Sequence, residues 1–134
     1  MLTELEKNAI RDHYRALSEN LPNFRPRTAQ REMIAAIANA FSRTKTQKEG
    51  EEAPKREGES IVVIEGPTGV GKSLAYLLAG GIMAQTRGKR LIVSSATVAL
   101  QEQLVGRDLP FVVEKSGLEL SFAIAKGRGR YLCP

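Results

Sequence analysis

The sequence has few of the residues that mark several large classes of protein. It has 134 residues, with no tryptophan and a single cysteine, Cys133. One cysteine excludes an internal disulfide and a metal site built only from thiolates of this chain. No apolar run approaches the roughly 20 residues that cross a bilayer, and the start of the chain lacks the layout of a signal peptide. We therefore expect a cytoplasmic protein without membrane contact.

Acidic residues are absent from the last part of the chain. None follows Glu119, whereas Lys126, Arg128 and Arg130 alternate with glycines near the end, and the formal net charge is +5. A flexible basic segment of this kind is able to follow a phosphate backbone. The alternative is a solvated surface loop. Composition alone does not separate the two. The hydrophobic fraction of 42% and the charged fraction of 26% are typical of a soluble globular domain.

The strongest motif is a glycine-rich loop that follows an apolar run and precedes a helix-compatible segment. Residues 66–73 have the pattern G-x-x-x-x-G-K-S/T of a phosphate-binding loop, also called Walker A. In that setting backbone N–H groups and a helix N-terminus surround phosphate oxygens. Lys72 is expected to reach the β- and γ-phosphates, and Ser73 to hold Mg²⁺. The predicted nucleotide-contacting residues here are Gly66, Pro67, Thr68, Gly69, Val70, Gly71, Lys72 and Ser73.

The remaining sequence alternates between helical and strand patterns. A Thr3-x-x-Glu6 capping box opens a predicted helix over 3–19. Apolar spacing predicts three more helices, and short apolar runs predict three strands. This alternation favours an α/β fold, a parallel sheet flanked by helices. Three strands make a thin sheet, so the chain is interpreted as incomplete. The further predicted helices cover 28–41, 72–86 and 97–105, and the predicted strands cover 61–64, 91–95 and 122–125.

The pattern divides the chain into three parts. Residues 1–41 form predicted N-terminal helices, and residues 42–60 are a charged, apolar-poor stretch that is expected to be a mobile surface loop. Residues 61–134 carry the phosphate-binding loop and all three predicted strands. The charges of the middle stretch cancel, which argues against a nucleic-acid-binding arm.

Gln30 is a candidate reader of the nucleobase. It follows Phe24 and Arg27 at the start of the second predicted helix. A glutamine amide offers both a donor and an acceptor, which match the N6 and N7 edge of adenine and not that of guanine. Phe24 is available for stacking on the base. The alternative is an ordinary surface glutamine, which is the commoner role for this residue at a helix start.

The order of these motifs resembles the first motor domain of superfamily 2 helicases. Arg27-x-x-Gln30 precedes the phosphate-binding loop, and Ser94-Ser95-Ala96-Thr97 follows the next predicted strand. The resemblance implies a RecA-like P-loop NTPase domain in which Gln30 with Arg27 selects adenine. It also implies that the segment from Ser95 to Gln103 touches the DNA backbone. Simple helix capping is the alternative for Ser94, Ser95 and Thr97.

The closing segment narrows the resemblance further. Residues 127–134, Gly-Arg-Gly-Arg-Tyr-Leu-Cys-Pro, are similar to the start of the iron–sulfur insertion in DinG-type, damage-inducible helicases, which are relatives of the XPD group. The resemblance implies that Cys133 is the first of four thiolates on a 4Fe–4S cluster. It further implies ATP-dependent unwinding of DNA, with single-stranded or forked DNA as the partner, and a role in DNA repair.

Several parts of such a helicase are missing from the sequence. No apolar run ends in an Asp-Glu pair that would position Mg²⁺ and water, and three of the four cysteines are absent. We therefore interpret the chain as an N-terminal, truncated part of a helicase that binds nucleotide without hydrolysing it. Two alternatives stay open. One is another P-loop NTPase, such as a small kinase or a GTPase, and the other is a non-catalytic module that binds nucleotide or nucleic acid. The oligomeric state is unknown.

Overall fold

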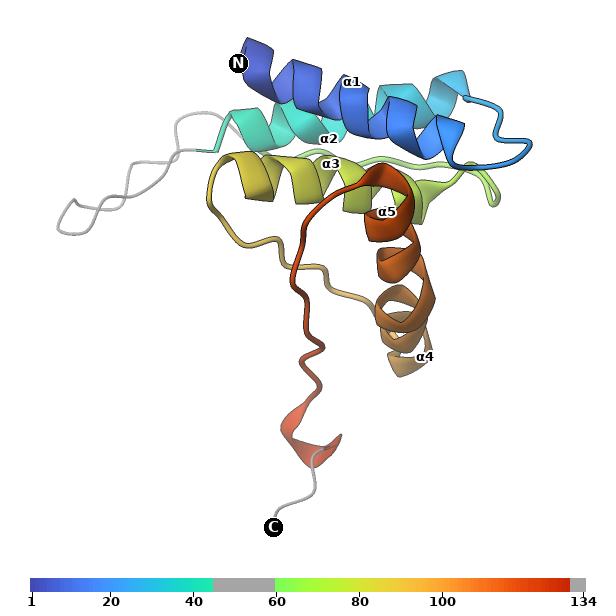
Figure 1. The fold of residues 1–134 in the computed structure, drawn as a ribbon. Helices are drawn as coiled ribbons and strands as arrows, with labels where there is room; N and C mark the ends of the chain where they lie inside the picture. Colours follow the sequence, from blue (N-terminus) through green and yellow to red (C-terminus); the bar gives the residue numbers. More distant parts are fainter. Residues whose placement is uncertain (45–59, 131–134) are drawn as a thin grey trace, which may run out of the picture.

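A computed structural model describes residues 1–44 and 60–130 (Figure 1). Five α-helices occur within these ranges, and none of them has the length and apolar character that a membrane span requires. The predicted loop at 42–60 lies mostly outside the described residues, as does Cys133. The helices are α1 (Glu4–Glu19), α2 (Thr28–Ser42), α3 (Lys72–Thr86), α4 (Val98–Gln103) and α5 (Leu109–Ser116), with a π-helical turn at Leu104–Asp108 and a 3₁₀ turn at Arg128–Arg130.

The predicted capping box at the start of α1 is confirmed. The Glu6 backbone N–H donates to Thr3 Oγ1 at 3.2 Å, and the Thr3 N–H donates to Glu6 Oε2 at 2.8 Å. Each side chain thus satisfies a backbone donor that the first turn of a helix leaves open. The predicted bounds of α2 and α3 are also confirmed to within one residue.

The core lies where α1, α2 and α3 pack together. Figure 1 shows these three helices stacked in layers, with α5 crossing beside them. Leu17 of α1 and most of the middle of α3 are buried. Two glycines of α3 are closely approached by leucine side chains from later in the sequence. A Cβ on Gly80 would lie 2.8 Å from Leu91 Cδ1, and a Cβ on Gly81 would lie 2.8 Å from Leu120 Cδ1. These glycines therefore let later segments pack closely on the helix. The main cluster of buried side chains comprises Met33, Ile34, Ile37, Val70, Ala75, Leu77, Leu78, Ala79, Ile82, Val112 and Leu118.

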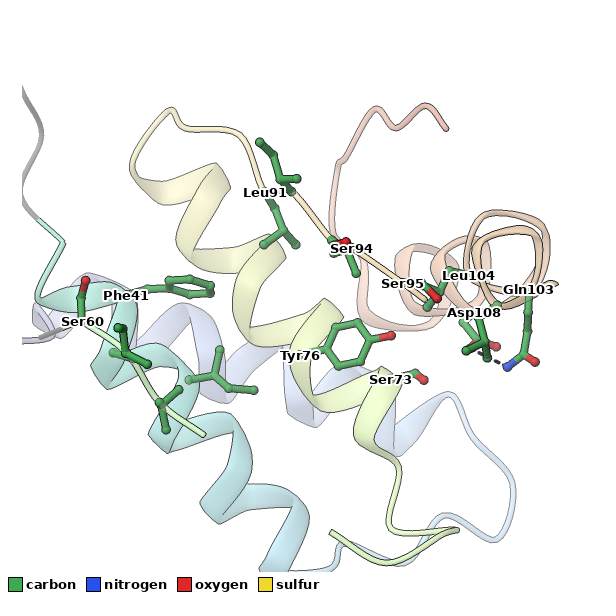
Figure 2. A pocket seen from close by; sticks show the side chains of 17 residues that line it. Phe41, Ser60, Ser73, Tyr76, Leu91, Ser94, Ser95, Gln103, Leu104 and Asp108 are labelled. Atoms are coloured by element: carbon green, nitrogen blue, oxygen red, sulfur yellow. Dashed lines mark hydrogen bonds between the residues drawn. The ribbon is translucent and has the colours of Figure 1, made fainter. Parts of the chain in front are cut away.

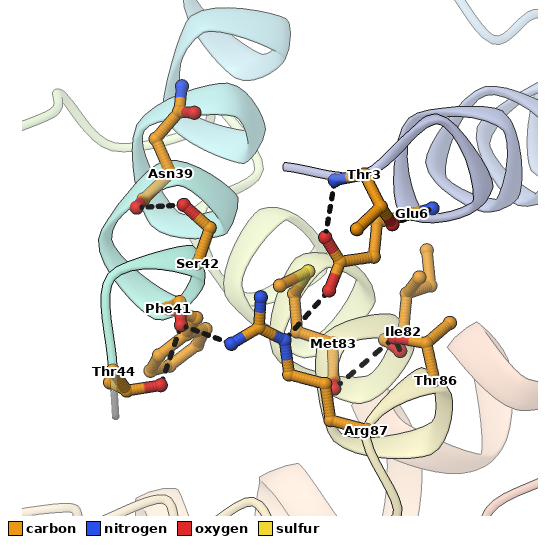
Figure 3. Close-up of polar contacts among 10 residues, drawn as sticks. All are labelled: Thr3, Glu6, Asn39, Phe41, Ser42, Thr44, Ile82, Met83, Thr86 and Arg87. Carbon is orange, nitrogen blue, oxygen red and sulfur yellow. Dashed lines mark hydrogen bonds and ion pairs between the residues drawn. The ribbon is translucent and has the colours of Figure 1, made fainter. Parts of the chain in front are cut away.

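An ion pair ties the three core helices together at one end (Figure 3). Arg87 Nε lies 2.7 Å from Glu6 Oε1, and Arg87 Nη1 donates to the Phe41 carbonyl oxygen at 3.0 Å. Burial by itself raises the pKa of Glu6, but the hydrogen bonds from Arg87 and Thr3 outweigh it and leave that pKa below its ordinary value. The carboxylate therefore stays charged at neutral pH.

The predicted parallel sheet is absent from the described residues, so the prediction of an α/β, RecA-like fold is wrong for this structure. Segments 61–64, 91–95 and 122–125 run without strand pairing. A β-strand is stabilised by a neighbour about 4.8 Å away that accepts and donates backbone hydrogen bonds. Instead, the first two segments both line one cavity of about 540 Å³. Several of their β-branched side chains face solvent, with Val63 91% and Ile92 89% exposed, whereas Ile64 packs partly buried against the core.

The helical structure after the second of these segments is longer than predicted. The sequence predicts a helix over 97–105, but α4, the π-helical turn and α5 run together to Ser116, where Gly117 ends the run at φ 70°. The end of α5 packs against α1. His13 Nδ1 donates to the Ser116 carbonyl oxygen at 2.7 Å, and Asn20 Nδ2 donates to that of Lys115 at 3.0 Å.

Candidate nucleotide-binding site

The glycine-rich loop leads directly into α3. Gly69 (φ 81°) and Gly71 (φ 85°) adopt left-handed backbone conformations, which glycine reaches without steric cost. Gly71 is the N-cap of α3 and provides no capping side chain. The N–H groups of the first turn therefore remain available to an anion, where the helix dipole adds positive potential.

Side chains from two other parts of the chain hold the carbonyl oxygens of this loop. Arg27 Nη1 donates to the Gly69 carbonyl, and Gln30 Nε2 lies 3.4 Å from the carbonyl oxygens of both Val70 and Gly71. In a planar trans peptide the C=O and the following N–H point in opposite directions. Fixing these three carbonyls therefore turns the N–H groups of Val70, Gly71 and Lys72 away from Arg27 and Gln30. A backbone turned in this way is suited to an anion on its other side.

Lys72 also contacts the loop. Its ammonium group donates to the Gly66 carbonyl oxygen at 2.6 Å and lies 3.4 Å from that of Pro67. The side chain thus folds back across the loop from the first position of α3. An ammonium group on this flexible stem is able to exchange carbonyl oxygens for phosphate oxygens without moving the helix.

Gln30 is buried, at 4% exposed, and most of its hydrogen-bonding capacity is used by the protein. Its Nε2 group faces the two loop carbonyls, and its Oε1 accepts from Tyr14 Oη at 3.2 Å. Burial raises the pKa of Tyr14, so the hydroxyl stays protonated and donates. An amide oxygen accepts two hydrogen bonds, so one acceptor position of Gln30 remains for a ligand.

Gln30 also explains why glycine is required at position 71. A Cβ built on Gly71 would lie 2.2 Å from Gln30 Nε2. At Gly69 a Cβ would meet nothing within 4 Å. The two glycines therefore share a backbone conformation, but only Gly71 is closely approached by another side chain.

A cavity of about 370 Å³ adjoins the loop. It brings Arg27, Gln30 and Phe24 together with the loop, as the nucleobase interpretation requires. The ring of Phe24 is held edge-on by Tyr14, with centroids 5.9 Å apart. Phe111 was not predicted here, because it lies on a helix that the sequence pattern did not indicate. Asn23 lies in a turn and was not predicted either. The lining residues are Leu21, Asn23, Phe24, Arg25, Arg27, Gln30, Gly69, Val70, Gly71, Leu74 and Phe111.

A second, larger cavity contains the candidate Mg²⁺ ligand. Figure 2 shows Ser73 on one wall, with Ser95, Gln103 and Asp108 on another. The Asp108 carboxylate accepts from Arg107 Nε at 2.9 Å and from Gln103 Nε2 at 3.2 Å. Across the part of the chain that the structure describes, no three His, Cys, Asp or Glu side chains are placed to hold a metal ion. Ser73 therefore offers a single oxygen, and a cation there would need phosphate oxygens and water for the rest of its shell.

The segment expected to touch DNA has local structural roles. Thr97 Oγ1 accepts from the Leu100 N–H at 3.2 Å and caps α4, and Ser95 Oγ lies 3.5 Å from the Thr97 carbonyl oxygen. Lys126 Nζ lies 3.0 Å from Glu102 Oε1, which links the basic end of the chain to α4. The capping role that the sequence left open for Thr97 is therefore present in the structure.

Comparison with known proteins shows which proteins this chain is similar to. No family model matches the chain. It is 44% identical over 133 residues to the ATP-dependent DNA helicase DinG of Escherichia coli and, at the same identity, to that of Salmonella typhimurium. Each match covers 99% of this chain and 17% of the relative. The DinG helicase of Photobacterium profundum is 43% identical, with 99% of this chain and 18% of that protein covered. The resemblance to DinG-type helicases is confirmed, and the chain spans less than a fifth of these relatives' length.

Proposed function

We propose that this chain supplies the ATP-binding part of a DinG-type, ATP-dependent DNA helicase. Similarity to helicases along almost the whole chain supports this assignment. The observation that carries it is the loop at 66–73, whose carbonyl oxygens are held by Arg27 and Gln30 beside a cavity of about 370 Å³. That arrangement offers N–H groups to phosphates and an enclosed space to a base.

The triphosphate is proposed to bind along the loop and the start of α3. Lys72 exchanges the Gly66 and Pro67 carbonyl oxygens for oxygens of the β- and γ-phosphates. Backbone N–H groups of Gly69, Gly71 and Lys72 contact the remaining phosphate oxygens. Ser73 contributes one oxygen to Mg²⁺, which neutralises phosphate charge when it is bound.

Adenine is proposed to occupy the cavity beside the loop. Phe24 stacks on the base, while Gln30 and Arg27 select it. Because the Nε2 protons of Gln30 face Val70 and Gly71, only the second acceptor position of its Oε1 is left for the base. That oxygen is suited to the N6 amino group of adenine, whereas guanine would present its O6 acceptor there.

Hydrolysis is proposed to require residues outside this chain. Asp108 lies in the same cavity as Ser73, but Arg107 and Gln103 already bind both of its oxygens. Among residues 1–44 and 60–130, no other acidic residue lines that cavity. Without a carboxylate to hold the metal and orient water, binding proceeds and phosphoryl transfer does not.

DNA contact and cluster binding are proposed for the longer helicase. Ser94, Ser95 and Thr97 are proposed to contact the backbone of single-stranded or forked DNA, together with the basic residues Lys126, Arg128 and Arg130. Cys133 is proposed as the first thiolate ligand of a 4Fe–4S cluster, which would need three cysteines that this chain lacks.

The test is calorimetric titration of the purified chain with Mg·ATP. Wild-type protein should bind, and Lys72→Ala should bind at least about 100-fold more weakly, because an ion-pairing group to two phosphates is lost. Lys89→Ala removes an exposed lysine just beyond the other end of α3 and should bind like wild type. Absence of Mg·ATP binding by the wild type would overturn the proposal. DNA-stimulated phosphate release by the chain alone would overturn the part that concerns hydrolysis.

A further inference from the structure

We propose that Asn23 is a specificity-determining residue for adenine, donating from its side-chain amide to N7 of the base while Gln30 accepts from N6. This inference rests on the proposed function, because it assumes that the nucleobase occupies the cavity beside the phosphate-binding loop. Asn23 lines that cavity, and its amide has no hydrogen-bond partner among residues 1–44 and 60–130.

A tight turn places Asn23 at the cavity wall. The Phe24 N–H donates to the Leu21 carbonyl oxygen at 3.2 Å, which closes a four-residue turn. Asn23 has φ 63° at the third position, and Pro22 precedes it at the second. This is the pattern of a type II turn, which needs a positive φ at its third position and favours glycine or asparagine there. The turn is therefore stable without a contact from the Asn23 side chain, so the amide is left for another role.

With Gln30 accepting from N6, the N7 atom of adenine still lacks a hydrogen-bond donor. The base presents a donor at N6 and an acceptor at N7. Gln30 retains only an acceptor position, because its Nε2 group faces the carbonyl oxygens of Val70 and Gly71. It therefore suits N6 but cannot also serve N7. A second group must donate to N7 for both atoms to be read.

The other polar side chains of the cavity do not supply this selectivity. Arg25 and Arg27 carry donors only, and an arginine pairs with the two acceptors N7 and O6 of guanine. Arg27 is in addition bound to the Gly69 carbonyl. An asparagine amide donates and accepts at once, which is the combination that favours adenine. Asn23 is the amide of the cavity that has this capacity unused.

The experiment compares ATP with 7-deaza-ATP, an analogue that lacks the N7 acceptor. Wild-type protein should bind 7-deaza-ATP about 3- to 10-fold more weakly than ATP, the range expected for one lost hydrogen bond. In Asn23→Gly this ratio should fall to about 1, because the donor to N7 is gone. Glycine keeps the positive φ of the turn, so the fold is preserved. Asn39→Ala, which removes an exposed amide on α2 away from the cavity, should keep the wild-type ratio.

A second variant changes the chemistry of the Asn23 side chain while keeping its size. Asn23→Asp retains the turn but replaces the donor with a carboxylate, so it should lose the discrimination between the two nucleotides and also bind ATP more weakly.

The outcomes distinguish the proposed function from the assignment of Asn23. If wild type binds no Mg·ATP, the proposed function fails. If wild type binds ATP but does not discriminate against 7-deaza-ATP, or if Asn23→Gly keeps the wild-type ratio, the assignment of Asn23 is overturned and nucleotide binding stands.

Discussion

Two valines seven positions apart show how differently the glycine-rich loop at 66–73 and the segment before it are packed. Val70 is buried at 7% exposed among the side chains of α2 and α3, whereas Val63 is 91% exposed. The loop is anchored by Val70 and by hydrogen bonds to its carbonyl oxygens. The preceding segment has no comparable anchor at Val63. The loop is therefore held at several points, while apolar surface is left exposed a few residues away.

The largest predicted effect tests how the loop is held. Gly71→Ala would drive a Cβ to 2.2 Å from Gln30 Nε2 at a backbone φ of 85°. Either Gln30 or the loop must move, so we expect affinity for Mg·ATP to fall by at least about 10-fold and the free energy of unfolding to fall by about 2 kcal/mol or more. Calorimetry and urea unfolding measure the two quantities.

Gly69→Ala is the matched control for this prediction. It imposes the same kind of backbone strain at φ 81°, but its Cβ would meet nothing within 4 Å. We expect a loss of only about 1–2 kcal/mol, which is the cost of the left-handed conformation alone. Removing the obstacle in Gly71→Ala/Gln30→Ala should recover part of the stability that Gly71→Ala loses. Equal losses for the two glycines would show that contact with Gln30 does not shape the loop.

The first three helices and the loop were predictable because their determinants are local, whereas α5 was not predicted. The capping box specified the start of α1, and the Gly-Lys-Ser sequence specified the start of α3. The absence of strand pairing among the described residues was not predictable. Residues such as Ile61 and Ile92 form a strand only when a neighbouring backbone pairs with their N–H and C=O groups, and the local sequence does not show whether it does. The hydrogen bond from Tyr14 to Gln30 was not predictable either, because it depends on how α1 packs against the start of α2. Asn23 had a usable signal, the Pro-Asn pair of a type II turn.

An effect of intermediate size on stability is predicted for the ion pair between Glu6 and Arg87. The pKa of Glu6 is lowered in the folded protein, so the ion pair contributes its stability above the ordinary carboxyl value of 4.5. That contribution is lost as the pH falls through the lower, folded value. Glu6→Gln should therefore cost about 1–2 kcal/mol at pH 7, and its difference from wild type should shrink below about pH 4.5. Urea unfolding at a series of pH values measures this.

Glu4→Gln is the control for the pH dependence of unfolding predicted for Glu6→Gln. Glu4 also has a lowered pKa, chiefly from its hydrogen bond with Lys7, but it lies at the surface of α1. Exposed pairs of this kind contribute little because water and salt screen them. A pH profile for Glu4→Gln that matched that of Glu6→Gln would mean that burial against Arg87 gives the ion pair no special role.

The smallest predicted effect is the direct test of the two valines. Val63→Ala should change the free energy of unfolding by no more than about 0.5 kcal/mol, because a side chain that is 91% exposed loses little apolar contact. Val70→Ala should cost about 1.5 kcal/mol, the value of two buried methyl groups. Urea unfolding of both variants under identical conditions gives the difference. If Val63→Ala were as damaging as Val70→Ala, the segment before the loop would have to be covered in solution. The contrast between an anchored loop and its exposed neighbour would then fail.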